Sequence, residues 1–264
     1  MSRLEAAISS PLSFRREISD GAGQFEEAAE TVGIVFDGRL FVWHAFSDKV
    51  DETTFGPWVA GPSVSSVLGD DDYKTVATEL ERFLSALVFL YAVPAEVIHY
   101  GSSFIIDPYA EPFTRGPRPP GWARKKPFDW LTLRRDSPPL LKALAWYREG
   151  INAGSPFYRF LAHWNALEAT FGFSEGRAAF IDRVTPTMNS AWTDYPLPAK
   201  PSAHFQEASR HAIAHVFRGK HRQVVDPDSD TDRQRLEWES RFMAMLTRAA
   251  IRETFGEPVE GGCV

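Results

Sequence analysis

A short segment toward the C-terminus concentrates side chains that could do chemistry: Glu207, Arg210, His211 and His215. An imidazole can take a proton from a ribose 2′-hydroxyl or return one to a leaving oxygen, because its ordinary pKa lies near neutrality. A guanidinium stays protonated and can stabilise negative charge that develops at phosphorus. Arg210 and His215 therefore form a candidate catalytic pair for RNA cleavage that needs no metal ion.

The spacing of this pair limits how one copy of the protein could use it. Apolar periodicity predicts a helix over residues 203–217, ended by Gly219. At about 100° per residue, Arg210 and His215 would point about 140° apart and lie about 7.5 Å apart along the axis. Either the long arginine side chain bends round the helix, or a second copy completes a shared cleft with its own pair.

Two other interpretations of the segment remain open. Glu207, His211 and His215 share one helical face and could ligate a metal ion, although Ala212 excludes the His-Glu-x-x-His motif. Alternatively, the histidines pack inside a bundle and Arg210 forms a salt bridge between helices. Other histidines without diagnostic spacing could add ligands: His163, His204 and His221.

Helical patterns dominate the chain from residue 138 onward. Ser155-Pro156 is typical of an N-cap followed by proline at the first helical position. A short helix is expected over residues 174–188. Thr231 with Gln234 forms a capping-box pattern before a last apolar stripe. About five helices with short connections predict an antiparallel bundle.

Two phrases in this half resemble a known superfamily. Tyr158-Arg-Phe-Leu-Ala-His-Trp-Asn-Ala-Leu-Glu168 followed by Arg210-His-Ala-Ile-Ala-His215 is similar to HEPN proteins, in particular to the Apea-like HEPN group and the methylamine-utilisation protein J-like family. The resemblance covers about residues 138–255 and implies a dimer of helical bundles. In active members it implies metal-independent endoribonuclease action at the dimer cleft, with Arg210 and His215 as the reactive pair and His211 as the polar residue after the arginine.

A carboxylate upstream supports the same site. Glu168 falls on the helical stripe of Leu161 and Trp164, where a carboxylate should be buried only if it is paired. We predict that Glu168 orients Arg210, with Glu207 as a second supporting carboxylate. An ordinary ion pair between two helices would look the same in the sequence.

Two basic clusters could bind RNA phosphates. The first follows the candidate pair and comprises Arg218, Lys220 and Arg222. The second lies among prolines and aromatic residues and comprises Arg124, Lys125 and Lys126. A favourable interaction with a helix dipole would explain the first cluster equally well, and a linker whose aromatic residues dock on a neighbouring domain would explain the second.

The N-terminal part, residues 1–109, is expected to form a small antiparallel sheet with one long helix. Asp37-Gly38 between two β-branched and aromatic runs predicts a hairpin. A second hairpin-like pair is expected over residues 97–100 and 104–106. Between the two hairpins, an acidic triplet can cap a helix whose apolar stripe runs from Tyr73 to Tyr91, and Pro94 should stop this helix. Because this half combines a sheet with a helix and the other half is helical, we expect an α+β protein.

The predicted organisation has four parts: an α+β domain (1–109), a Pro-rich basic linker or loop (110–137), a HEPN-like helical bundle (138–256) and a tail (257–264). The N-terminal domain could recognise a protein or a small ligand. The leading hypothesis is an RNA-binding protein or metal-independent endoribonuclease that acts as a homodimer. The alternatives are a non-catalytic dimerisation or interaction module and a metal-binding helical protein.

Composition narrows these classes further. The 264 residues carry a net charge of −6, which argues against a surface that tracks a nucleic-acid backbone throughout, while local basic patches remain open. The single cysteine, Cys263, excludes an intramolecular disulfide and a cysteine-based zinc site. We see no secretory signal and no run long enough to span a membrane. A cytoplasmic protein without a cofactor is therefore expected.

Overall fold

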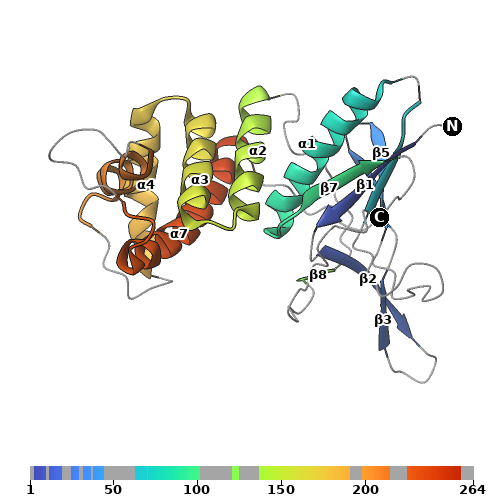
Figure 1. Cartoon of the computed structure of the whole chain (residues 1–264), viewed down its shortest axis with the longest axis horizontal. Coiled ribbons are helices and arrows are strands. Elements are labelled where there is room, and N and C mark those ends of the chain that lie inside the picture. Colours follow the sequence, from blue (N-terminus) through green and yellow to red (C-terminus); the bar gives the residue numbers. More distant parts are fainter. Residues whose placement is uncertain are drawn as a thin grey trace. The chain divides into compact units, whose positions relative to one another are not determined.

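The computed structural model describes eleven stretches of the chain: residues 3–9, 12–19, 25–29, 32–36, 38–44, 63–69, 71–101, 121–124, 137–190, 198–214 and 225–256. They belong to two compact units, residues 1–130 with 259–264 and residues 131–258. The first unit combines strands with one long helix, and the second is helical (Figure 1). The predicted α+β class is confirmed.

Five strands of the first unit form one antiparallel sheet. Their order across the sheet is β4 (Val32–Phe36), β5 (Arg39–His44), β6 (Ser63–Val67), β1 (Arg3–Ser9) and β7 (Glu96–Gly101). The hairpin predicted from Asp37-Gly38 is confirmed, because β4 pairs with β5 and Gly38 has a φ of 79°, a conformation that suits glycine. Strand β7 pairs with β1, and residues 104–106 of the second predicted hairpin lie outside the described residues.

One face of this sheet is covered by helix α1 (Tyr73–Tyr91), at the predicted position. The ring of Phe41 on β5 stacks on Phe83 of α1 with centroids 4.8 Å apart, and both side chains are completely buried. Asp72 caps the helix, since its Oδ1 accepts a hydrogen bond from the backbone N–H of Thr75 at 2.7 Å. The helix ends at Ala92, whose φ of 52° is left-handed, before Pro94 is reached.

This unit also contains a second, three-stranded sheet, which the sequence analysis did not predict. Its order is β3 (Phe25–Ala29), β2 (Leu12–Ser19) and β8 (Gly121–Arg124), with β2 and β8 parallel. Strand β8 lies inside the segment predicted as a linker or loop, so part of that segment is paired in a sheet. The boundary between the two units also falls in that segment, after residue 130.

The second unit is a helical bundle in which α3 (Pro156–Phe171) packs against both α2 (Pro138–Asn152) and α7 (Asp230–Phe255), as Figure 1 shows. Helix α4 (Ser174–Ser190) packs on α3 and α7. Aromatic side chains fill the centre, with Phe160, Trp164, Phe205 and Phe242 all almost completely buried. Burying each such side chain contributes about 1.5–3 kcal/mol, so this core is the main source of the bundle's stability.

Helix starts in the bundle follow the predicted signals at all but one position. Prolines occupy the first turn of α2 and α3, and Ser155 holds the N-cap position of α3 without a side-chain capping bond. The capping box predicted at Thr231 and Gln234 is wrong, because Ser229 caps α7 by accepting from the N–H of Asp232 at 3.4 Å. Within the described stretches, no helix is both long and apolar enough to cross a membrane.

Candidate functional site

The segment that carries Arg210 is helical, but half of residues 201–214 are not α-helical. A short α5 (Pro201–His204) continues into a π-helix, η2 (Phe205–His211), and then into α6 (Ala212–Ala214). A π-helix bonds residue i to i+5, is rare, and occurs frequently at functional sites. The helix prediction is thus right, but the angular separation estimated from α-helix geometry does not apply within residues 205–211.

A buried carboxylate on α7 holds this segment from inside. Glu239 is 0% exposed, and its Oε1 lies 2.8 Å from Nε2 of His204. Its Oε2 accepts a hydrogen bond of 2.6 Å from the hydroxyl of Ser209. Phe205 anchors the same side of η2 by packing against Phe160 and Phe242. The residue directly before Arg210 is therefore fixed in the bundle core.

Glu239 was missed in the sequence, although a usable signal was present. It lies three residues after the buried Leu236 and four before the buried Met243, so it falls on the core stripe of its helix. A carboxylate in such a position needs partners. The same reasoning had drawn attention to Glu168 and would have applied equally to Glu239.

The predicted contact between Glu168 and Arg210 is not formed. Glu168 Oε1 pairs instead with Nη1 of Arg177 on α4 at 3.0 Å, and it also accepts a hydrogen bond of 2.8 Å from the indole N–H of Trp164. The guanidinium of Arg177 lies over the ring of Trp164, 4.6 Å from its centroid. The end of α3 faces α4 here, which is why an arginine of α4 takes the carboxylate.

Arg177 and Arg210 are nevertheless close enough to influence each other. Burial lowers the pKa of Arg177, and the positive charge of Arg210 lowers it further, while the carboxylate of Glu168 opposes both effects. Arg177 is 8% exposed, whereas Arg210 is partly exposed. The two guanidinium groups are therefore near enough to interact electrostatically, and only that of Arg177 is paired with Glu168.

Glu207 and His211 pair with each other along η2. Nδ1 of His211 lies 3.3 Å from Oε2 of Glu207, and the carboxylate is about half exposed. In the described part of the chain, no three His, Cys, Asp or Glu side chains are grouped so that they could hold a metal ion. The third ligand of the metal hypothesis, His215, lies outside the described residues, so that hypothesis stays a prediction.

Several other predicted site residues also lie outside the described residues. They are Arg218, Lys220 and Arg222 after the candidate pair, and Lys125 and Lys126 in the basic segment. Arg124 ends strand β8, and its side chain is likewise outside the description. Their RNA-binding role and the catalytic role of His215 stay predictions.

His163, considered above as an additional metal ligand, belongs to the core. It is 0% exposed and packs against Tyr147, with ring centroids 5.3 Å apart. Neither ring nitrogen has a hydrogen-bond partner. Burial, together with the nearby charge of Arg159, lowers its pKa to about 3. This imidazole is therefore neutral at physiological pH and enclosed by apolar groups.

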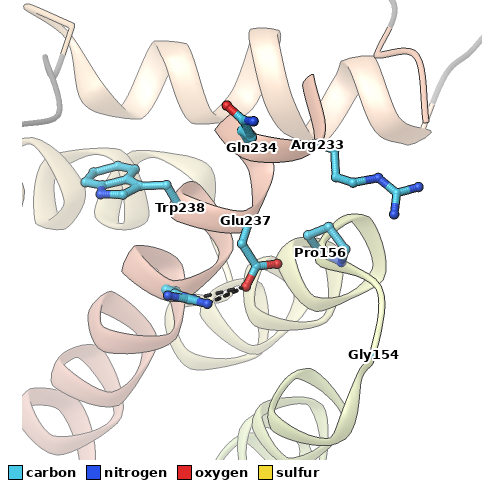
Figure 2. A pocket seen from close by; sticks show the side chains of 7 residues that line it. Gly154, Pro156, Arg233, Gln234, Glu237 and Trp238 are labelled. Atoms are coloured by element: carbon cyan, nitrogen blue, oxygen red, sulfur yellow. Dashed lines mark hydrogen bonds and ion pairs between the residues drawn. The ribbon is translucent and has the colours of Figure 1, made fainter. Parts of the chain in front are cut away.

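A hollow of about 640 Å³ lies along α7 and the turn between α2 and α3 (Figure 2). Its lining includes Gln234, the second residue of the capping box that was predicted for α7. The carboxylate of Glu237, which is labelled in Figure 2, pairs with Arg241 at 2.9 Å and with Arg159 at 3.0 Å. Arg210 does not line the hollow, so the predicted site is separate from it. The residues that line the hollow are Gly154, Pro156, Arg233, Gln234, Glu237, Trp238 and Arg241.

The helical C-terminal half is similar to HEPN-type proteins. Residues 143–252 match the family described as Methylamine utilization protein MauJ, which confirms the resemblance predicted for the C-terminal half. The match covers the helices from α2 to α7 and none of the N-terminal sheets. Comparison with curated proteins and with solved structures gave no significant match.

Proposed function

We propose that the C-terminal bundle binds RNA and cleaves it without a metal ion, using Arg210 and His215 at a groove shared by two copies of the chain. The observation that carries this proposal is the placement of Arg210. A π-helical segment fastened by Glu239 presents Arg210 beside a second guanidinium, Arg177. Two guanidinium groups that are close enough to repel each other favour binding of a phosphodiester, whose negative charge relieves that repulsion.

The proposed reaction needs only these groups. His215 takes the proton of a ribose 2′-hydroxyl, whose oxygen attacks the adjacent phosphorus. The bond from phosphorus to the 5′-oxygen breaks, and that oxygen receives a proton, for which the histidine of the second copy is the proposed donor. The products are a 2′,3′-cyclic phosphate and a 5′-hydroxyl. Arg210 stabilises the charge on the phosphoryl oxygens in the transition state, and His211, paired with Glu207, lies next to it.

Cleavage of a mixed RNA pool in EDTA tests this function. Arg210→Ala and His215→Ala should each reduce the rate by at least about 100-fold, as expected for loss of a transition-state contact or of a general acid–base. Mapping of 2′,3′-cyclic phosphate ends identifies the chemistry. Arg183→Ala is the matched control, because Arg183 lies on α4 in an exposed pair with Glu253. Full activity in both site variants, or no cleavage by the wild type, would contradict the nuclease proposal.

Arg177 should contribute to RNA affinity even where cleavage is blocked. In a His215→Ala background, Arg177→Gln should weaken RNA binding about tenfold. It should also reduce the slope of log K for RNA binding against the logarithm of the salt concentration by about one, as expected for the loss of one phosphate contact. Glu168 would keep the indole N–H of Trp164 as a partner in this variant. Fluorescence anisotropy at several salt concentrations measures both quantities. Arg183→Gln serves as the control, and an equal loss in the two variants would argue against a specific role for Arg177.

A second candidate function is a non-catalytic interaction module, and the N-terminal sheet favours it. Val35 and Leu40 face each other across β4 and β5 and are 58% and 52% exposed. Val67 on the neighbouring β6 is 39% exposed. Neighbouring exposed aliphatic side chains on a sheet are typical of protein-binding surfaces. Absence of RNA cleavage by the wild type would favour this interaction function over the nuclease function.

A further inference from the structure

One carboxylate, that of Glu239, bonds to a residue just before the π-helical segment and to a residue within it. His204 directly precedes η2, and Ser209 is the residue before Arg210. Both bond to Glu239, one to each carboxylate oxygen, at 2.8 and 2.6 Å. Since Glu239 is 0% exposed, these bonds form away from bulk water, where leaving a polar group without a partner is costly.

The spacing of the two bonded residues matches the π-helix and not the α-helix. His204 and Ser209 are five residues apart, the interval of π-helical hydrogen bonding. In an α-helix, residues five apart point about 140° away from each other, so one carboxylate could not bond both. The bridge to Glu239 is therefore compatible only with the wide register.

We propose that Glu239 is a positioning residue that selects the π-helical register of residues 205–211 and so fixes the direction of Arg210. This inference rests on the proposed function, because its consequence concerns the same phosphate-binding site. A change to the α-helical register would rotate every residue after the change by a large fraction of a turn. Arg210 would then turn away from Arg177, and the pair of cations would be lost.

The side chains around the bridge suit this role. Phe205 is 0% exposed and Ser209 is 0% exposed, so the core side of η2 has no room to slide. Nη2 of Arg235, also on α7, donates a 3.2 Å hydrogen bond to the carbonyl oxygen of Ala208. Helix α7 thus bonds to η2 at the backbone carbonyl of Ala208 as well as at the side chain of Ser209.

Variants of the bridge separate positioning from general stability. Glu239→Leu removes both bonds, and Ser209→Ala removes one with little change in volume. Glu239→Gln is the conservative variant, because its amide oxygen can accept from His204 while its NH₂ group donates to the hydroxyl of Ser209. Thr247→Val is the matched control, since Thr247 is a completely buried residue of α7 that bonds elsewhere, to the carbonyls of Met243 and His163.

The test combines RNA binding with hydrogen exchange of the full chain. In Ser209→Ala and Glu239→Leu, RNA affinity should fall at least about tenfold and the amides of residues 205–211 should exchange at least about tenfold faster. Glu239→Gln should stay within about threefold of the wild type in both measurements. Thr247→Val should lower the melting temperature without either effect.

The outcomes distinguish this inference from the proposed function. If the wild type binds RNA and Ser209→Ala binds it equally tightly, the positioning role is wrong while the function stands. If the wild type binds no RNA, the function fails, and hydrogen exchange alone decides the role of Glu239. Unchanged exchange of residues 205–211 in Ser209→Ala would overturn the inference in either case, and so would equal acceleration in Thr247→Val. Should Glu239→Leu fail to fold, Ser209→Ala carries the test.

Discussion

Lowering the pH from 7 to 4 should remove about 3 kcal/mol from the free energy of unfolding through His163 alone. The imidazole is completely buried, and burial with the charge of Arg159 lowers its pKa from 6.5 to about 3. Between these two pKa values the unfolded chain binds a proton that the folded chain does not. The contribution of His163 is therefore fully present above about pH 6.5 and is lost as the pH falls toward 3.

Urea unfolding of the wild type and His163→Leu at both pH values measures this contribution. The variant lacks the titrating group, and it loses no side-chain hydrogen bond, because neither ring nitrogen of His163 has a partner. The stability of the wild type relative to the variant should fall by about 3 kcal/mol between pH 7 and pH 4. Parallel pH profiles of the two proteins would show that the folded imidazole titrates normally.

A second readout does not depend on any variant. The ring-proton resonances of His163 should not shift between pH 7 and pH 4 in the folded wild type, because its imidazole stays neutral over that range. Titration near pH 6.5 would contradict the burial argument directly.

Local signals in the sequence were sufficient for most of the elements. The Asp37-Gly38 turn and the apolar stripe of α1 each specify a structure through residues close together in the chain. The same holds for the prolines that open α2 and α3. Strands β1 to β3 gave no such signal, because short strands with charged residues become strands through partners that are distant in sequence.

The geometry of the candidate site depends on contacts that no local pattern contains. The π-helical register is tied to Glu239, a residue of α7 that lies 30 positions beyond Ser209. The partner of Glu168 is supplied by α4, where Arg177 gave no motif. Sequence reasoning could therefore identify Arg210 and a carboxylate of the same neighbourhood, but it could not assign which cation pairs with which carboxylate.

Two findings change the chemistry expected of the site: Glu168 pairs with Arg177 and not with Arg210, and Glu239 holds the segment that carries Arg210. A carboxylate bonded directly to Arg210 would have neutralised the group that we propose to bind phosphate. With Glu168 paired to Arg177, Arg210 keeps its positive charge on a partly exposed surface. The carboxylate that we propose to position Arg210 is Glu239, which is buried and bonds to Ser209, the residue before Arg210. Binding and positioning are thus assigned to different groups.

Gly150→Ala should lower the free energy of unfolding by about 3 kcal/mol, because the added methyl group would overlap the ring of His163. A Cβ at Gly150 would lie 2.5 to 2.7 Å from three atoms of that ring, closer than carbon and nitrogen atoms approach without a bond. The ring is fully buried against Tyr147, so it cannot move aside without displacing another core side chain. Normal helix propensity would favour alanine over glycine by about 1 kcal/mol, so the predicted sign is opposite to the usual one.

Gly176→Ala is the matched control within the same bundle. Its Cβ would lie 3.8 Å from Phe171, an ordinary contact, so this substitution in α4 should raise stability by about 0.5–1 kcal/mol. Thermal and urea unfolding of both variants give the comparison. Adding His163→Ala to Gly150→Ala should then remove most of the penalty, since no ring remains to be overlapped. If Gly150→Ala proved as stable as Gly176→Ala, the ring of His163 would have to lie farther from residue 150 than these distances indicate.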